Sequence, residues 1–173
     1  TIPVVLFPGN AFQLTNKADA LLLLSLISGR NAEWLIGQHV QAAKVIQESA
    51  LETISTGYIL IDGGNTTAVE RVSKTKPLQR DAINEVVSTA LAGQLLGHKL
   101  IYLEAGSGAQ NPVPTALIKA VKKAIDIPLI VGGGLTSTDA IKKAYEAGAD
   151  IVVVGNYLET HLEKMVDFCA VRN

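Results

Sequence analysis

Short runs of apolar residues recur along the chain, and each run stops at a turn rich in glycine or polar residues. The runs lie at residues 3–7, 20–26, 58–61, 100–103, 128–131 and 151–154. Apolar residues follow one another in these runs without polar alternation, which is typical of strands in a parallel sheet covered on both faces. The sequence therefore predicts six buried strands.

Amphipathic stretches between these runs predict four helices, at residues 31–48, 81–96, 114–124 and 138–147. In the third, Leu117 and Val121 share an inward face with Ile118, and the lysines face outward. Ser137 or Thr138 can cap the fourth helix, and Gly148 can end it. The segment at residues 11–17 is poorly helical and is predicted to be a loop.

Alternating strands and helices predict an α/β fold with a parallel sheet and right-handed crossovers, in one domain over residues 1–173. Two architectures fit six strands: an open sheet, or a TIM (β/α)8 barrel from which two βα units are absent. The chain opens on a strand without a methionine, so we expect an N-terminally incomplete barrel that lacks its first two units. Ligands bind at the carboxyl ends of the strands in both architectures.

Composition narrows the classes of function. Of the 173 residues 48% are hydrophobic, the net charge is −1 and the lysines are scattered, so we expect no nucleic-acid partner. The longest apolar run, at residues 18–29, is interrupted by Asp19 and is too short to span a bilayer. Cys169 is the only cysteine; it predicts a buried structural thiol and fits a reducing, cytoplasmic location.

Glycine turns follow the last two predicted strands. Gly132, Gly133 and Gly134 precede a predicted helix, and Gly155 with Asn156 repeats the arrangement one βα unit later. Glycines let the backbone approach an anion closely, and the free N–H groups of a following helix can receive a phosphate. Phosphate sites in (β/α)8 enzymes commonly lie after strands seven and eight. These turns predict a phosphate site, although tight turns need glycine in any case.

Three further groups of residues could carry chemistry. Glu104 ends a strand, where its carboxylate could bind substrate hydroxyls or accept a proton, or could simply cap a turn. The segment 62–67, Asp-Gly-Gly-Asn-Thr-Thr, could hold a hydrated metal or a diphosphate, or form an Asx-type turn. We interpret His39 as a buried, satisfied histidine and Trp34 as core or pocket wall. No grouping shows zinc spacing.

Several of these segments resemble the geranylgeranylglyceryl phosphate synthase family. The resemblance is carried by Tyr-Leu-Glu-Ala-Gly-Ser-Gly-Ala at 102–109, Gly-Tyr-Ile-Leu-Ile-Asp-Gly-Gly at 57–64, Val-Gly-Gly-Gly at 131–134 and Val-Gly-Asn at 154–156. Leu-Phe-Pro-Gly at 6–9 and Leu-Ile-Gly-Gln-His at 35–39 are similar as well. The motif around Glu104 is the most specific of these, and the likeness extends over nearly the whole chain in order.

The resemblance implies a prenyltransferase that joins sn-glycerol 1-phosphate to a polyprenyl diphosphate, in the first step of archaeal-type ether lipid synthesis. It implies Glu104 as the catalytic residue, which holds the glycerol hydroxyls. The substrate-binding residues it implies are Tyr102, Leu103, Glu104, Ala105, Gly106, Ser107, Gly108, Gly133, Gly134, Gly155 and Asn156.

The resemblance also implies Mg2+, carried in the family on the first strand and near the second. Neither strand is identifiable here, so the metal ligands are unassigned and a chain this short is expected to be inactive. Leu21 to Leu26, the helix with Trp34 and Ile59 are expected to line a prenyl groove, in which Trp34 limits the tail length. We further expect a homo-oligomer with transient membrane contact.

Two other functions stay open at this stage. A different phosphate-binding barrel, such as a sugar-phosphate isomerase or aldolase, would share the glycine turns, but no lysine stands at the end of a predicted strand. A non-catalytic phosphate-binding or assembly module would share them too.

Overall fold

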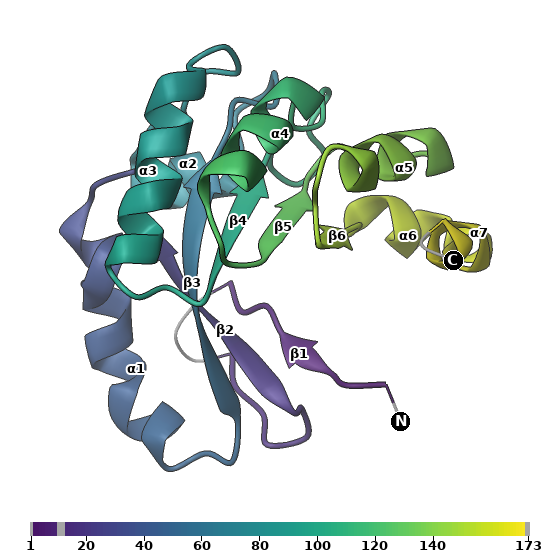
Figure 1. Cartoon of the computed structure of the whole chain (residues 1–173). Coiled ribbons are helices and arrows are strands. Elements are labelled where there is room, and N and C mark those ends of the chain that lie inside the picture. Colours follow the sequence, from purple (N-terminus) through teal and green to yellow (C-terminus); the bar gives the residue numbers. More distant parts are fainter. Residues whose placement is uncertain (1, 10–12, 172–173) are drawn as a thin grey trace.

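The structure is a computed structural model that describes residues 2–9 and 13–171. Its six strands form one parallel sheet in the order β1-β2-β3-β4-β5-β6 (Figure 1). They are β1 (Val5–Leu6), β2 (Ala20–Leu26), β3 (Glu52–Leu60), β4 (Leu100–Glu104), β5 (Leu129–Gly132) and β6 (Ile151–Val153).

The strictly sequential strand order decides between the two predicted architectures. A doubly wound open sheet reverses its strand order at a switch point, whereas each described strand here pairs with the next one along the chain. Right-handed crossovers taken in one direction place the connecting helices on one face, as in a TIM barrel. The fold is therefore a six-stranded, TIM-like half-barrel, and the open-sheet alternative is wrong.

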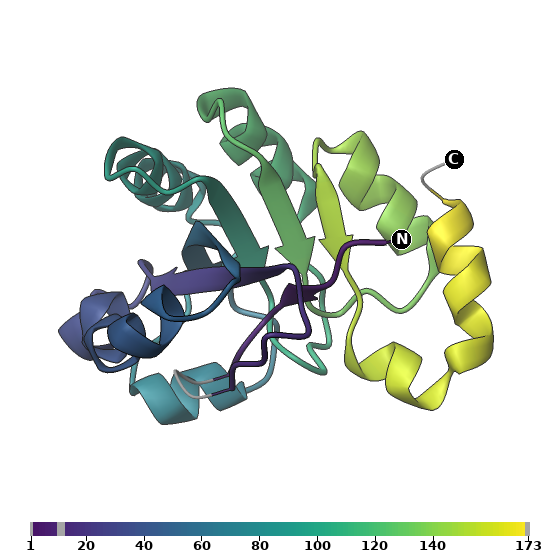
Figure 2. The same cartoon turned by 90° about the horizontal axis from the view of Figure 1, so that it is seen from below.

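Helices α1, α3, α4 and α5 form an arc outside the curved sheet (Figure 2). In chain order the helices are η1 (Glu33–Gly37), α1 (Gln38–Gln47), α2 (Ala68–Ser73), α3 (Ile83–Leu95), α4 (Thr115–Ala124), α5 (Thr138–Glu146), α6 (Asn156–Thr160), η2 (Leu162–Lys164) and α7 (Met165–Ala170). Ser137 caps α5 by accepting a hydrogen bond from the N–H of Ala140, and Gly148 follows this helix with φ of 112°.

Alternate side chains of the strands enter two separate cores. Ile59, Ile101 and Leu103 point outward and pack with Leu117 and Val121 of α4, as the amphipathic pattern predicts. The opposite face carries a second cluster on the concave side of the sheet, which consists of Leu22, Leu26, Tyr58, Leu60, Leu100, Tyr102 and Ile130. The strands read as continuous apolar runs because both faces of the sheet are covered.

Several features differ from the sequence prediction. Strand β3 begins at Glu52, six residues before the predicted start, because the exposed residues Glu52 and Thr53 still pair with β2. Helices α2 and α6 were not predicted. Cys169 is exposed rather than buried, because the short helix α7 turns Phe168 inward instead.

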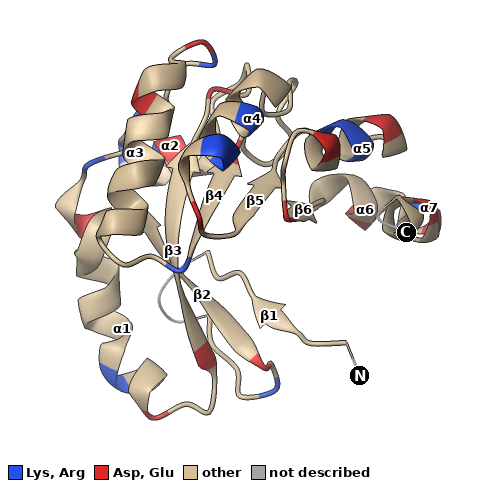
Figure 3. Ribbon diagram, viewed as in Figure 1, with Lys and Arg blue, Asp and Glu red and all other residues tan. Residues whose placement is uncertain are grey.

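Charged residues of both signs are interspersed over the helices and turns, while the middle of the sheet is almost free of them (Figure 3). No helix in the described part of the chain is long and apolar enough to cross a membrane. The glycine turns and Glu104 lie together at the carboxyl edge of the sheet.

Candidate active site

Glu104 is the last residue of β4 and presents its carboxylate at the carboxyl edge of the sheet. Only 7% of the residue is exposed. Its Oε1 accepts a hydrogen bond of 2.7 Å from the backbone N–H of Gly106. Burial raises the pKa of Glu104 above its ordinary value of 4.5, and the neighbouring Tyr102 and Gly106 oppose that rise. A carboxylate held in this way is a better proton acceptor than one in water.

Tyr102 lies two residues earlier on the same face of β4 and is fully buried. Its ring packs against the rings of Phe7 and Tyr58, with centroids 5.4 Å and 5.3 Å away, and those two rings lie 6.3 Å from each other. Burial, and then the charge of Glu104, raises the pKa of Tyr102, so the hydroxyl stays protonated. The Tyr102 hydroxyl lies close to the carboxylate of Glu104, but it forms no hydrogen bond of acceptable geometry with any of the described residues.

The turn after β5 packs directly on the turn after β4. Gly133 and Gly134 have φ of 84° and 70°, the left-handed region that glycine adopts freely. A Cβ atom at Gly133 would contact Oε1 of Glu104 and would lie 2.7 Å from the nitrogen of Gly106. The N–H groups of Gly133 and Gly134 have no partner among the described residues. Successive free N–H groups in such a turn form a concave site for an anion.

Gly155 and Asn156 lie at the neighbouring strand end. The register pairs Gly132 with Val153, so the turn that starts helix α6 stands beside the glycine turn of β5 (Figure 1). Both residues are exposed. The two predicted phosphate turns are thus adjacent in space, although no direct hydrogen bond joins them in the described residues.

The other predicted substrate-binding residues divide into two groups. The side chains of Leu103 and Ala105 are fully buried in the core beneath the helices, so only their backbone faces the carboxyl edge. Ser107 and Gly108 are exposed in the turn after β4, and Ser107 lines the cavity beside Glu104. The motif therefore contributes Glu104 and Ser107 as side chains and Gly106 as a backbone donor.

An apolar cavity of about 220 Å3 runs along β2 from Glu104. Its apolar walls come from β2, η1, α1 and α2 and include Leu21, Leu22, Leu24, Leu26, Trp34 and Ile46. Thr67 and Ser107 line it beside Glu104, and Gln38 and His39 of α1 add polar groups to the lining. The walls predicted from Leu21 to Leu26 and Trp34 are present. The prediction for Ile59 is wrong, because its side chain points to the outer core.

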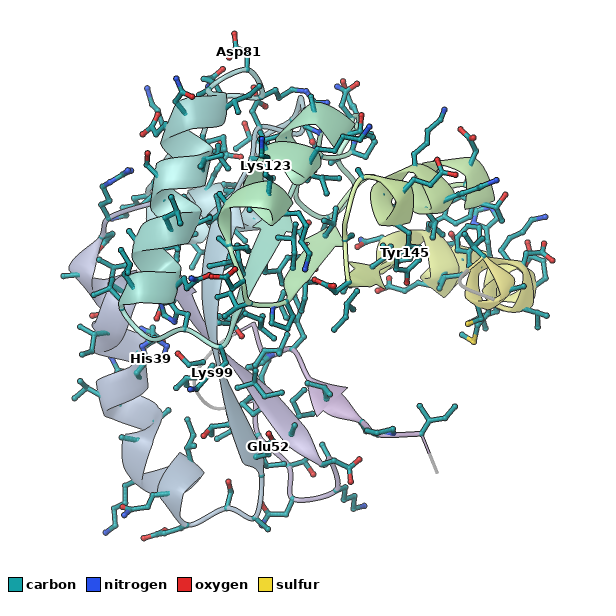
Figure 4. All side chains as sticks on the ribbon, in the orientation of Figure 1. His39, Glu52, Asp81, Lys99, Lys123 and Tyr145 are labelled. Carbon is teal, nitrogen blue, oxygen red and sulfur yellow. The ribbon has the colours of Figure 1, made fainter. Side chains whose placement is uncertain are left out.

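A π-helical turn, η1, holds Trp34 against this cavity. Two side chains fasten it and α1 to the sheet. The hydroxyl of Ser25 donates to the carbonyl of Leu35 at 3.1 Å, and Nε2 of His39 lies 2.8 Å from the carbonyl of Leu24. His39 projects from α1 toward the strands (Figure 4); it is hydrogen-bonded as predicted, but it is half-buried rather than buried. Single π-turns are frequent at functional sites.

Asp62 forms the Asx-type turn that was one of its two predicted alternatives. Its Oδ1 accepts a hydrogen bond of 2.9 Å from the N–H of Gly64. Across residues 2–9 and 13–171 no three His, Cys, Asp or Glu side chains are grouped as metal ligands. Because Mg2+ in proteins is usually held by one or two carboxylates together with waters and substrate phosphates, its ligands stay unassigned among the described residues.

Sequence reasoning missed α2 and the aromatic residues on the concave face. Thr67 and Glu70 form a capping box: Oγ1 of Thr67 accepts from the N–H of Glu70, whose carboxylate accepts from the N–H of Thr67. The spacing Thr-x-x-Glu is itself a helix-start signal. It would have placed Val69 on a helix, where it lines the cavity. Phe7 gives no comparable signal, because its position depends on contacts distant in sequence.

Comparison with known proteins adds independent evidence. Residues 1–172 match the sequence profile of the PcrB family. A curated protein of Zunongwangia profunda, named geranylgeranylglyceryl phosphate synthase, is 58% identical over 158 residues, which are 91% of this chain and 68% of the relative. The protein of that name from Pyrococcus furiosus is 42% identical over 160 residues, covering 92% of this chain and 63% of the relative.

The fold has close counterparts among solved structures. The (S)-3-O-geranylgeranylglyceryl phosphate synthase of Thermoplasma acidophilum, solved in complex with its substrate sn-glycerol-1-phosphate, aligns with a TM-score of 0.87 at 36% identity. The alignment covers 98% of this chain and 67% of that structure. The chain spans about two thirds of the length of the relatives it matches.

Proposed function

Because the chain belongs to the PcrB family, we propose that the protein is a prenyltransferase that joins sn-glycerol 1-phosphate to a polyprenyl diphosphate of the geranylgeranyl type. The product is an ether-linked prenylglyceryl phosphate, the first intermediate of archaeal-type ether lipids. The relatives that match the chain at 58% and 42% identity carry the name of this activity.

One observation carries the proposal: the buried carboxylate of Glu104 lines a cavity whose walls are mostly apolar. A ligand that fills this cavity needs a long apolar part for the walls along β2 and a polar reacting end beside Glu104. A polyprenyl diphosphate has this composition, and a sugar phosphate does not. The residues that line the cavity thus favour prenyl transfer over the isomerase or aldolase alternative.

The second substrate is proposed to bind at the glycine turns. Its phosphate accepts hydrogen bonds from the backbone of Gly133, Gly134, Gly155 and Asn156. The neighbouring structure from Thermoplasma acidophilum binds sn-glycerol-1-phosphate, which supports this assignment. The glycerol hydroxyls then extend toward the segment from Tyr102 to Gly108, where Glu104 receives them.

In the proposed reaction the bond between the first prenyl carbon and the diphosphate oxygen breaks, and the diphosphate leaves with the bonding electrons. The oxygen of the glycerol hydroxyl forms the new ether bond to that carbon. Glu104 holds this hydroxyl and receives its proton. The raised pKa of Glu104 makes the carboxylate a stronger base than an ordinary glutamate.

The family resemblance adds Mg2+ as the proposed metal. Since the described residues do not group as metal ligands, we place its protein ligands in the part of the relatives that this chain does not match. The same part is proposed to supply two further βα units that complete an eight-stranded barrel. The half-barrel leaves β1 and β6 as edge strands with exposed Val5 and Ile151, which further strands would cover.

Homo-oligomeric assembly, a cytoplasmic location and transient membrane contact belong to the same proposal. A single free cysteine suits a reducing compartment. A polyprenyl diphosphate resides at membranes, so the mouth of the cavity has to meet one while the substrate enters.

The test uses the complete natural protein with Mg2+, radiolabelled sn-glycerol 1-phosphate and prenyl diphosphates of several lengths, followed by extraction into organic solvent. The proposal expects label in the organic phase, and none when sn-glycerol 3-phosphate replaces its enantiomer. A folded protein that binds phosphate but transfers no label to any tail would contradict it and favour a non-catalytic phosphate-binding module.

A further inference from the structure

Arg80 occupies an unusual position at the carboxyl edge of the sheet. Nη1 of its guanidinium donates to the carbonyl of Asp62 at 3.1 Å and to that of Asn111 at 3.4 Å, and Nη2 donates to the carbonyl of Pro112 at 2.8 Å. Among the described residues no carboxylate lies within ion-pairing distance of Arg80. The side chain thus serves three backbone oxygens rather than a counter-ion.

The segment that carries Arg80 is itself fixed to the sheet. Leu78 pairs with the end of β3: its N–H donates to the carbonyl of Leu60, and its carbonyl accepts from the N–H of Asp62, each at 2.9 Å. Arg80 therefore starts from a rigid base two residues away. Its carbonyl acceptors come from the loop after β3 and from the loop after β4.

The acceptors at Asn111 and Pro112 belong to the returning limb of the β4 loop, residues 109–112. The loop after β3 also holds this limb, because the N–H of Asn111 donates to the carbonyl of Gly63 at 3.1 Å. The other side of the limb faces the glycine turn. A Cβ atom at Gly134 would lie 3.0 Å from the nitrogen of Pro112 and 3.1 Å from the carbonyl oxygen of Ala109.

We infer that Arg80 is a positioning residue for the phosphate turn: its guanidinium fixes the limb at residues 109–112, and the limb in turn fixes Gly134. Arg80 acts through these carbonyls and does not touch the substrate. A planar guanidinium can serve several oxygens in fixed directions, whereas the ammonium of lysine is a compact point charge. The inference rests on the proposed function only where substrate binding is measured.

The test compares Arg80→Lys with Arg71→Lys in the complete protein. Arg71 is a matched control, because it is exposed and its guanidinium donates to one local carbonyl, that of Thr66 at 3.0 Å. The first readout is amide hydrogen exchange without ligand. For Arg80→Lys we expect exchange about tenfold faster at the hydrogen-bonded amides of residues 105–111, and no change for Arg71→Lys. Unchanged exchange in Arg80→Lys would overturn the inference, whatever the enzymatic activity.

The second readout separates positioning from chemistry. Arg80→Lys is expected to weaken binding of sn-glycerol 1-phosphate, or of inorganic phosphate, about tenfold and to raise KM equally, while kcat stays within about twofold. A fall in kcat with KM unchanged would contradict a positioning role. If the protein transfers no prenyl group at all, the phosphate affinity and the exchange rates still decide the inference.

Chemical rescue tests the same inference in Arg80→Ala, a variant that disturbs the loop more than Arg80→Lys does. In Arg80→Ala, added methylguanidinium can occupy the emptied space and donate to the same carbonyls. We expect it to restore at least half of the lost phosphate affinity and to slow exchange at the hydrogen-bonded amides of residues 105–111. Failure of methylguanidinium to restore either quantity would overturn the inference.

Discussion

Gly133 leaves the space that the carboxylate of Glu104 occupies, since a Cβ atom at Gly133 would contact Oε1 of Glu104. The same Oε1 accepts the hydrogen bond from Gly106. The glycine turn of β5 and the acid of β4 are therefore one structural unit, and a change in the turn displaces the acid.

Gly133→Ala is expected to damage activity and stability together. The left-handed φ of 84° costs alanine about 1–2 kcal/mol in the free energy of unfolding, and the methyl group also displaces Glu104. We expect kcat to fall at least about tenfold, as measured in the organic-extraction assay alongside thermal unfolding.

Gly97→Ala is the matched control for this change. Gly97 has φ of 94°, but a Cβ atom there would meet no atom within 4 Å. It should lose similar stability and keep wild-type kcat. Equal kcat in the two alanine variants would show that the contact between residue 133 and Glu104 does not matter for catalysis.

The pH dependence of activity should follow the raised pKa of Glu104. The carboxylate form accepts the proton, so kcat/KM should rise with pH along an acidic limb whose midpoint lies above 4.5. A pH–rate profile of the wild-type enzyme measures this midpoint. A midpoint at or below that of a free glutamate would exclude Glu104 as the titrating base.

The same shift has a consequence for stability. Folding raises the pKa of Glu104, so the folded state binds this proton more tightly than the unfolded state. The stability that this proton contributes is present below pH 4.5 and is lost as pH rises through the folded-state pKa. Glu104→Gln cannot ionise, so its unfolding temperature relative to wild type should increase between about pH 4 and about pH 7. A constant difference over that range would contradict the shift.

Trp34→Ala should change the preferred prenyl length. Trp34 lines the apolar cavity, and removal of its indole opens room for additional methylene groups at about 0.8 kcal/mol each. We expect kcat/KM for a longer tail, relative to the geranylgeranyl tail, to increase about tenfold. Ile36→Ala, on the exposed side of the same helical turn, should leave the ratio unchanged; an equal shift in both variants would argue against a wall formed by Trp34.

Thr67→Ala should loosen α2 and the cavity wall that it carries. Loss of the capping box costs about 1 kcal/mol and should raise KM for the prenyl diphosphate. Ser137→Ala removes the cap of α5, which does not line the main cavity. Thermal unfolding should show a comparable loss in both variants, and only Thr67→Ala should change KM. A raised KM in both would show that stability alone sets it.

Much of the fold was predictable because the strands are buried on both faces. Short uninterrupted apolar runs such as residues 100–103 are typical of strands in a parallel sheet covered on both faces, and the glycine turns mark their carboxyl ends. The polar start of β3 at Glu52 was missed, because pairing with β2 holds exposed residues in a strand that their own pattern does not predict.

The motifs of the site could be predicted from the sequence, but the positions of its side chains relative to one another could not. Glu104 was identified from its strand-end position, and Thr67 was noted without its capping role. The position of Phe7 over Tyr102, and of Arg80 beneath the β4 loop, depends on contacts between segments far apart in the sequence. Ile59 was assigned to the cavity because the side of the sheet that a residue faces depends on register, and a change of one position reverses it.

The most direct test of Glu104 as the proton acceptor is the turnover of Glu104→Gln in the complete enzyme. The assay contains Mg2+, saturating sn-glycerol 1-phosphate and geranylgeranyl diphosphate. Glutamine keeps an oxygen for the N–H of Gly106 but cannot take up the hydroxyl proton. Glu146→Gln, at an exposed position on α5, is the control. We expect kcat to fall about 100-fold or more in Glu104→Gln alone, with the fold intact. Wild-type kcat in a folded Glu104→Gln enzyme would contradict this expectation.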